Sequence, residues 1–202
     1  MNAPIDAVIF DVGKVLLDFD WNLAIEKIAA RSPLTPAQIV DYVKNDGALI
    51  DYETGKITSL DFFQNQKNAF QYRGSWEDLA ASWCGIFTPI KDNIALARQL
   101  AGRCRLALLS NTNEAHVDHF EPAYDFSALF PVRVYSCRVG YMKPRREIYE
   151  AVTTQLQVSP ERTVFIDDLE ANTAAATALG WKTVHYRPGL DLPAALRALG
   201  LD

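Results

Sequence analysis

The sequence predicts an α/β fold, a doubly wound parallel sheet with a small all-helical domain inserted after the first strand. Short apolar runs alternate with helical patterns near the N-terminus and through the second half of the chain, as in parallel sheets. These runs are continuously apolar, which is typical of strands buried on both faces. Between residues 21 and 88 the patterns are helical, and no convincing strand is found.

The five predicted strands follow the apolar runs in order. They are Ala7–Phe10, Cys104–Ser110, Val132–Ser136, Thr163–Asp167 and Lys182–Tyr186. Helix-end signals separate the later strands. Gly102 and Gly180 stand where the C-terminus of a helix favours glycine. Pro144 is suited to the first turn of the helix that follows it.

The inserted segment carries its own helix signals. Trp21–Ser32 is amphipathic, and Thr35 with Gln38 forms a capping box pattern around a proline. Ser59 and Ser75 are expected to be the N-caps of two further helices. We therefore expect a helical cap domain at 18–88 and an α/β core at 1–17 and 89–202.

Two linkers would join these domains, near Leu17–Asp20 and Phe87–Ile90. A cap on two linkers can close over a site to exclude water and open to release product. We expect the turn at Glu53–Lys56 to face the site, and Trp21 to lie near its mouth.

Composition limits the possible partners. The chain has 202 residues and a net charge of −5, without a basic stripe, so nucleic acid is not expected as a partner. Cys84, Cys104 and Cys137 share no short spacing and are interpreted as reduced thiols of a cytoplasmic protein. No leader pattern and no membrane-spanning run is apparent, so no membrane association is expected.

Polar residues gather where the predicted strands end. The first strand ends at Asp11, the second at Ser110-Asn111 and the fourth at Asp167-Asp168, and Lys143 follows the third. A single aspartate after a strand is usually a turn or cap residue. The carboxyl ends of parallel strands share one edge, however, where α/β proteins bind their ligands. The ordered set therefore predicts one site.

These motifs resemble those of the haloacid dehalogenase-like hydrolase superfamily. "FDVGKVL", "LLSNTN", "GYMKP" and "FIDDLEAN" are similar to its four motifs, and the resemblance covers the whole chain, including the helical cap. A glycine in the first motif, the Asp-Asp-x-x-x-Asn pattern and "ETGKIT" are similar to the α-D-glucose-1-phosphate phosphatase type. The resemblance implies a Mg²⁺-dependent phosphatase that acts on a small phosphorylated metabolite, with a sugar phosphate as the narrower expectation.

The resemblance also implies a role for each acidic residue. Asp11 would be the nucleophile and form an aspartyl-phosphate that water hydrolyses. The metal ligands would be Asp11, the backbone carbonyl of Gly13 and Asp168. Asp167 and Asn172 would support this site by holding metal-bound water or orienting the lysine.

The phosphate-binding groups come from the second and third motifs. Lys143 would place a positive charge beside the phosphate. The Ser110 hydroxyl and the amides of Asn111 and its neighbour would bind the phosphate oxygens. The helix expected to start at Pro144 would add its positive end, and Arg145 and Arg146 are candidates for a second contact.

One acid is missing from the first motif. Most phosphatases of the superfamily have a second aspartate two residues after the first, which protonates the leaving oxygen, but this chain has Gly13 there. Asp18 or Asp20, a metal-bound water, or a good leaving group such as an anomeric phosphate could compensate. We favour the last two in combination.

Two other functions remain open. Haloacid dehalogenases also lack the second acid, because halide needs no proton, and they use no metal. Asp167 and Asp168 beside Asp11 argue against a dehalogenase, because clustered carboxylates repel unless a cation lies among them. The second alternative is a catalytically weakened member of the superfamily that binds phosphate or a protein. The presence of Asp11, Lys143 and Asp168 argues against it.

The histidines are interpreted as structural. His116 and His119 lie three residues apart on a predicted helix, a spacing that can hold a metal. No third ligand is apparent, so a solvated or partly packed face is expected. His185 lies in a strand and is expected to be structural.

Overall fold

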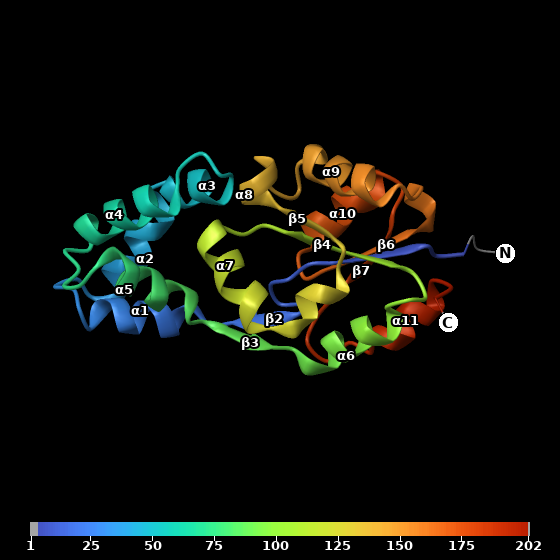
Figure 1. Ribbon diagram of the computed structural model, residues 1–202, viewed down its shortest axis with the longest axis horizontal. Helices are drawn as coiled ribbons and strands as arrows, with labels where there is room; N and C mark the ends of the chain where they lie inside the picture. The colour runs from blue at the N-terminus through green and yellow to red at the C-terminus, as the bar shows by residue number, and fades with distance from the viewer. Residues whose placement is uncertain (1–3, 202) are drawn as a thin grey trace.

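The computed structural model describes residues 4–201 as two lobes (Figure 1). One contains a parallel sheet with helices on both faces, and the other contains helices α1–α5, which we call the cap. Residues 1–3 and 202, assigned to the core from the sequence, lie outside the described residues. Among residues 4–201, no helix has the length and apolar character needed to cross a membrane.

The sheet has the order β5-β4-β1-β6-β7, and all of its strand pairs are parallel. This confirms the predicted fold class, and two strands keep their predicted bounds. The other three shorten by one residue, because Cys104 makes only an isolated bridge, Ser136 begins a helix and Tyr186 follows the last strand. The strands are β1 (Ala7–Phe10), β4 (Arg105–Ser110), β5 (Val132–Tyr135), β6 (Thr163–Asp167) and β7 (Lys182–His185).

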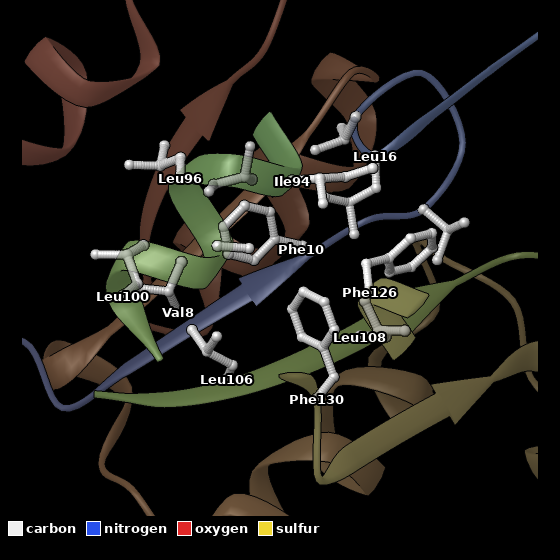
Figure 2. Close-up of a cluster of buried hydrophobic side chains, with 14 of the residues drawn as sticks. Val8, Phe10, Leu16, Ile94, Leu96, Leu100, Leu106, Leu108, Phe126 and Phe130 are labelled. Atoms are coloured by element: carbon white, nitrogen blue, oxygen red, sulfur yellow. The ribbon is translucent and has the colours of Figure 1, made fainter. Parts of the chain in front are cut away.

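Helices cover both faces of this sheet. Val8 and Phe10 pack on one face with the helices α6 (Lys91–Leu100), α7 (Glu114–Ala123) and α11 (Leu192–Ala198). Figure 2 shows Phe10 among Ile94 of α6 and other apolar side chains of this cluster. Ala7 and Ile9 pack on the other face with the helices α9 (Arg146–Leu156) and α10 (Glu170–Ala178). Two covered faces explain why the strands are apolar throughout.

Strand β1 lies at the centre of the sheet, where the strand order reverses. The chain runs from β1 outward to β4 and β5, then returns to the other side of β1 for β6 and β7. In such sheets the crevice for ligands opens at the carboxyl end of the strands beside this reversal. Asp11, the residue after β1, therefore lies where the topology places a site.

The cap has a core of its own, which includes the buried aromatic side chains of Tyr52, Phe62, Phe63 and Trp83. Its helices are α1 (Trp21–Ala29), α2 (Pro36–Asn45), α3 (Ala48–Glu53), α4 (Ser59–Ala69) and α5 (Trp76–Cys84). The capping box at Thr35 and the N-cap at Ser75 are confirmed.

The predicted N-cap at Ser59 is wrong. Thr58 caps α4, because Asp61, three residues after it, completes the capping box. Pro144 does not begin a helix either. Helix α9 starts at Arg146, so Pro144 belongs to the preceding loop.

The two linkers pair with each other, which the sequence did not predict. Strands β2 (Leu17–Phe19) and β3 (Phe87–Pro89) form a short antiparallel ribbon between the lobes. The remaining short elements are α8 (Ser136–Val139), η1 (Asp125–Leu129) and η2 (Pro160–Arg162).

Candidate active site

Asp11 is held firmly at the end of the central strand. Its backbone amide continues the ladder by donating to the carbonyl of Ile166 at 2.9 Å. Its carboxylate Oδ1 accepts a hydrogen bond from the amide of Val12 at 2.7 Å. The residue is only 7% exposed, so the carboxylate has a fixed position in largely dry surroundings.

Lys143 is the cation of the site. Its Nζ lies 2.9 Å from Asp11 Oδ1 and 2.7 Å from Asp167 Oδ2, and it donates to the carbonyl of Leu109 at 2.9 Å. The Asn111 side chain accepts from the Lys143 amide and donates to the Lys143 carbonyl. The side chain of Asn111 therefore positions the lysine loop, which leaves its backbone amide for the predicted role at a phosphate.

Asp167 and Asp168 complete the acidic cluster. Asp167 is fully buried, and it accepts hydrogen bonds from the amide of Leu169 and from Asn172 Nδ2. His185 Nε2 lies 2.9 Å from the carbonyl oxygen of Asp168, a structural contact as expected for this histidine. One oxygen from each of Asp11, Asp167 and Asp168 lies within 4.8 Å of the other two.

The charges of this cluster do not balance. Burial raises the pKa of Asp11 to about 7, and Lys143 opposes this while Asp167 and Asp168 add to it. Burial and Asp167 raise the pKa of Asp168. Burial favours a lower pKa for Lys143, but Asp11 and Asp167 outweigh it and the pKa is raised. One ammonium among three carboxylates leaves an excess of negative charge that a divalent cation with oxygen ligands fits.

A cavity of about 150 Å³ opens beside these residues, between the sheet and the cap. Gly13, Ser110 and Asn111 line it from the core side, whereas Trp21 and Glu53 line it from the cap. Thr112, the next residue after Asn111, also lines the cavity, but its amide donates to Ser136 Oγ. The phosphate contact expected from the amide of this neighbour is therefore not available in this arrangement. The structure thus brings the predicted site residues to one edge of the sheet, although their chemical roles stay predictions.

The space beside Gly13 is filled by an aromatic ring. A Cβ atom at this position would lie 3.1 Å from Cε1 of Phe19. The acidic residues that follow along the chain are also engaged. Asp18 Oδ1 lies 2.6 Å from Lys14 Nζ, and Asp20 caps α1 by accepting from the amide of Asn22. Neither of them is among the residues that line the cavity.

His116 differs from its prediction. It is 5% exposed, lines the cavity and contacts the rings of Trp21 and Phe87. Burial lowers its pKa to about 3, so it is neutral. The expected solvated or partly packed face is therefore wrong for His116, whereas His119 is exposed. The spacing on α7 could have predicted a buried face, because His116 is followed one and four residues later by buried Val117 and Phe120.

Glu53 is a second cavity residue whose place the sequence only partly indicated. Its turn was expected to face the site, and the residue does line the cavity. Burial raises the pKa of its carboxyl group to about 7. Arg145 and Arg146, in contrast, are exposed and pair with Glu147 and Glu150, so they offer no phosphate contact in this arrangement.

Residues 5–180 match the family of haloacid dehalogenase-like hydrolases. The chain belongs to this family of hydrolases. Among its curated relatives, a sesquiterpene phosphatase from Aspergillus oryzae is 31% identical over 98% of both chains. D-ribitol-5-phosphate phosphatase from Bacteroides thetaiotaomicron is 25% identical over 91% of this chain and 93% of the relative.

Solved structures agree with this assignment. A haloacid dehalogenase family enzyme from Bacteroides thetaiotaomicron, crystallised with magnesium and inorganic phosphate, superposes with a TM-score of 0.86 at 26% identity. The match covers 96% of this chain and all of that one. An L-2-haloacid dehalogenase also superposes, with a TM-score of 0.64 at 21% identity over 93% of this chain and 89% of that one, which shows a shared fold alone.

Proposed function

We propose that this hydrolase is a Mg²⁺-dependent phosphatase that cleaves a small phosphate monoester through an aspartyl-phosphate on Asp11. The observation that carries the proposal is the cluster of Asp11, Asp167 and Asp168 around buried Lys143, at the edge of a cavity lined by Ser110. The phosphatase relatives and the magnesium and phosphate complex of a similar enzyme support it.

The residues divide the work of phosphoryl transfer between them. Asp11, the Gly13 carbonyl and Asp168 would hold Mg²⁺, which would neutralise charge so that an anionic carboxylate can approach an anionic phosphate. Asp11 attacks the phosphorus, while Lys143 stabilises the charge on the phosphate oxygens. Ser110 and the Asn111 amide orient the phosphate, and Asp167 holds Lys143 in place.

The dehalogenase alternative explains the acidic cluster poorly. Three carboxylates whose oxygens approach within 4.8 Å repel one another, and a metal-free dehalogenase would gain nothing from this cost. The weakened-member alternative does not explain why a charged lysine is buried. Removing the Lys143 ammonium from water costs roughly several kcal/mol, and a catalytic role for the lysine would explain this cost.

Hydrolysis of p-nitrophenyl phosphate separates these three functions. We expect turnover with Mg²⁺, none with a chelator, and none for Asp11→Asn, while the exposed cap variant Asp41→Asn keeps wild-type rates. Metal-independent halide release from 2-chloropropionate would instead establish the dehalogenase. Phosphate binding without turnover would establish the weakened member.

A second cavity bears on the organic part of the substrate. It occupies about 330 Å³ within the cap and shares Trp21 and Glu53 with the site cavity. Apart from Glu53 and Lys44, all of its lining side chains are apolar, and they include Ile25, Ile28 and Val43. This lining favours a phosphate ester with an apolar organic group over the sugar phosphate expected from the sequence.

A substrate panel decides between these classes. We expect prenyl and long-chain alkyl phosphates to give a higher kcat/KM than hexose 1-phosphates, hexose 6-phosphates, pentitol phosphates and nucleotides. The apolar chain would occupy the cap cavity and be removed from water there. A clear preference for any sugar phosphate would reject the apolar class and leave the phosphatase proposal intact.

A further inference from the structure

We propose that Glu53, carried by the cap, is the acid and base of this site and takes the place of the carboxylate absent at Gly13. This inference rests on the proposed phosphatase function. It assigns a catalytic role to a residue outside the four sequence motifs, and it replaces the metal-bound water and the good leaving group favoured from the sequence.

The position of Glu53 is the first observation. It is the one carboxylate among the residues that line the site cavity, and it lines this cavity together with Gly13 and Ser110. Among residues 4–201, no hydrogen bond or ion pair occupies its side chain. Asp18 and Asp20, the other acids near the first motif, are engaged with Lys14 and with the start of α1.

Two contacts between the cap and the core fix the turn that carries Glu53. On one side, Tyr52 Oη accepts a hydrogen bond from the amide of Ala115 in α7 at 3.0 Å. On the other, Gly55 lies so close to α8 that a Cβ there would overlap the carbonyl oxygen of Cys137. Figure 1 shows α3 beside α8. With anchors one and two residues away, Glu53 is held at the cavity whenever the cap is closed.

The surroundings leave Glu53 able to hold a proton at neutral pH. Burial raises the pKa of its carboxyl group to about 7, and no charged group is among the causes of this shift. His116 is neutral, and the Cys84 and Cys137 thiols have pKa values raised to about 12. Lys44 of α2 lines the cap cavity together with Glu53. The charged groups on the elements around it also include the Asp51–Lys56 pair and the Glu114–Arg138 pair. A carboxyl group with a pKa near the working pH suits general acid catalysis.

The proposed proton transfers balance over two steps. In the first, Asp11 forms a bond to phosphorus as the ester P–O bond breaks, and the Glu53 carboxyl gives its proton to the departing alcohol oxygen. In the second, the Glu53 carboxylate takes a proton from water while the water oxygen bonds to phosphorus. The Asp11–phosphate bond breaks, inorganic phosphate leaves, and Glu53 is again protonated.

The variant Glu53→Gln tests this with two leaving groups. An alkyl phosphate needs the acid in the first step, so we expect kcat to fall by about 10²–10⁴-fold. p-Nitrophenolate needs no proton, so with p-nitrophenyl phosphate the first step stays fast and only the second slows. We therefore expect a burst of p-nitrophenol equal to the enzyme concentration, with phosphate trapped on Asp11 and detectable by mass spectrometry.

Three comparisons make the result decisive. Glu26→Gln, the same change on the exposed face of cap helix α1, should keep wild-type kinetics. Glu53→Asp should recover part of the rate. With the alkyl phosphate, wild type should show a fall in kcat/KM at high pH as Glu53 ionises, and Glu53→Gln should lose this fall. An unchanged rate, or an equal loss for both leaving groups without a burst, would overturn the role of Glu53. Absence of Mg²⁺-dependent turnover in wild type would instead reject the underlying phosphatase function.

Discussion

Lys143 is the residue whose surroundings link stability to function most directly. Its ammonium is buried, with Asp11 and Asp167 within 2.9 Å and 2.7 Å. A buried charge keeps its place only when its partners remain, because an unpaired charge in the interior is strongly destabilising. The same three groups are assigned to phosphoryl transfer, so changes here should affect folding and turnover together.

Replacement of this lysine should show both effects. Lys143→Met leaves two buried carboxylates unpaired, and we expect the free energy of unfolding to fall by roughly 3–5 kcal/mol, with loss of turnover. Urea unfolding in the presence of a chelator measures the first effect. Lys91→Met, on the exposed surface of α6, is the matched control and should change stability little. A stable Lys143→Met protein would show that the ion pairs do not support the fold.

Glu53 makes a separate prediction about pH. Its pKa in the folded protein is about 7, above the ordinary value of 4.5, so the folded state holds this proton more tightly than the unfolded state. The resulting stabilisation is complete below about pH 4.5 and is lost as the pH rises through about 7. Relative to Glu53→Gln, wild type should lose on the order of 3 kcal/mol across this window. Parallel stability curves for the two proteins would contradict the raised pKa.

Among the secondary-structure elements, the sequence predicted the strands whose side chains are buried on both faces of the sheet. The five sheet strands were predictable because helices cover both faces, which requires continuous apolar runs. The ribbon of β2 and β3 was not, because each strand has three residues and pairs only with the other linker. Thr58 was missed because Ser59 is an equally good cap by type, and only Asp61 distinguishes them.

The candidate site was predictable to the same extent. Asp11, Lys143 and the Asp167-Asp168 pair follow strands whose order along the chain determines their meeting point. Phe19 over Gly13 and Glu53 at the cavity depend on how the cap docks on the core, and no local pattern encodes that docking. The burial of His116 was predictable from its spacing to Val117 and Phe120. The domain bounds at 18 and 88 also stay predictions.

The docked turn between α3 and α4 should control closure of the cap. In Gly55→Ala the new methyl group would overlap the Cys137 carbonyl oxygen, so the cap cannot close fully, and we expect kcat to fall about tenfold or more. Gly47→Ala is a matched control, because Gly47 also has a positive φ, of 72°, but open space around its Cβ position. Equal kinetics for the two variants would show that the contact at Gly55 does not matter.

For the whole molecule, the two lobes have separate cores and separate tasks. The sheet lobe supplies the residues assigned to the phosphate, whereas the cap encloses the apolar cavity of about 330 Å³. Because Trp21 and Glu53 line both cavities, a substrate can present its phosphate to one lobe and its organic group to the other. Specificity should therefore change with cap residues that lie far from Asp11.

Filling the cap cavity should alter substrate choice alone. Val43→Phe places a ring where an apolar chain would lie, and we expect kcat/KM for a long-chain alkyl phosphate to fall about tenfold or more. The value for p-nitrophenyl phosphate should be unchanged. Leu60→Phe, on an exposed part of α4, is the control and should affect neither substrate. A uniform loss on both substrates would mean that the cavity does not receive the organic group.

The ring of Phe19 also bears on which side chains position 13 accepts. An aspartate introduced there would have its Cβ 3.1 Å from that ring, so the ring would have to shift by a few tenths of an ångström. That shift would disturb the contacts of Phe19 with Phe87 and Trp21. The packing of this ring thus favours glycine at position 13, and with it an active site whose acid comes from the cap.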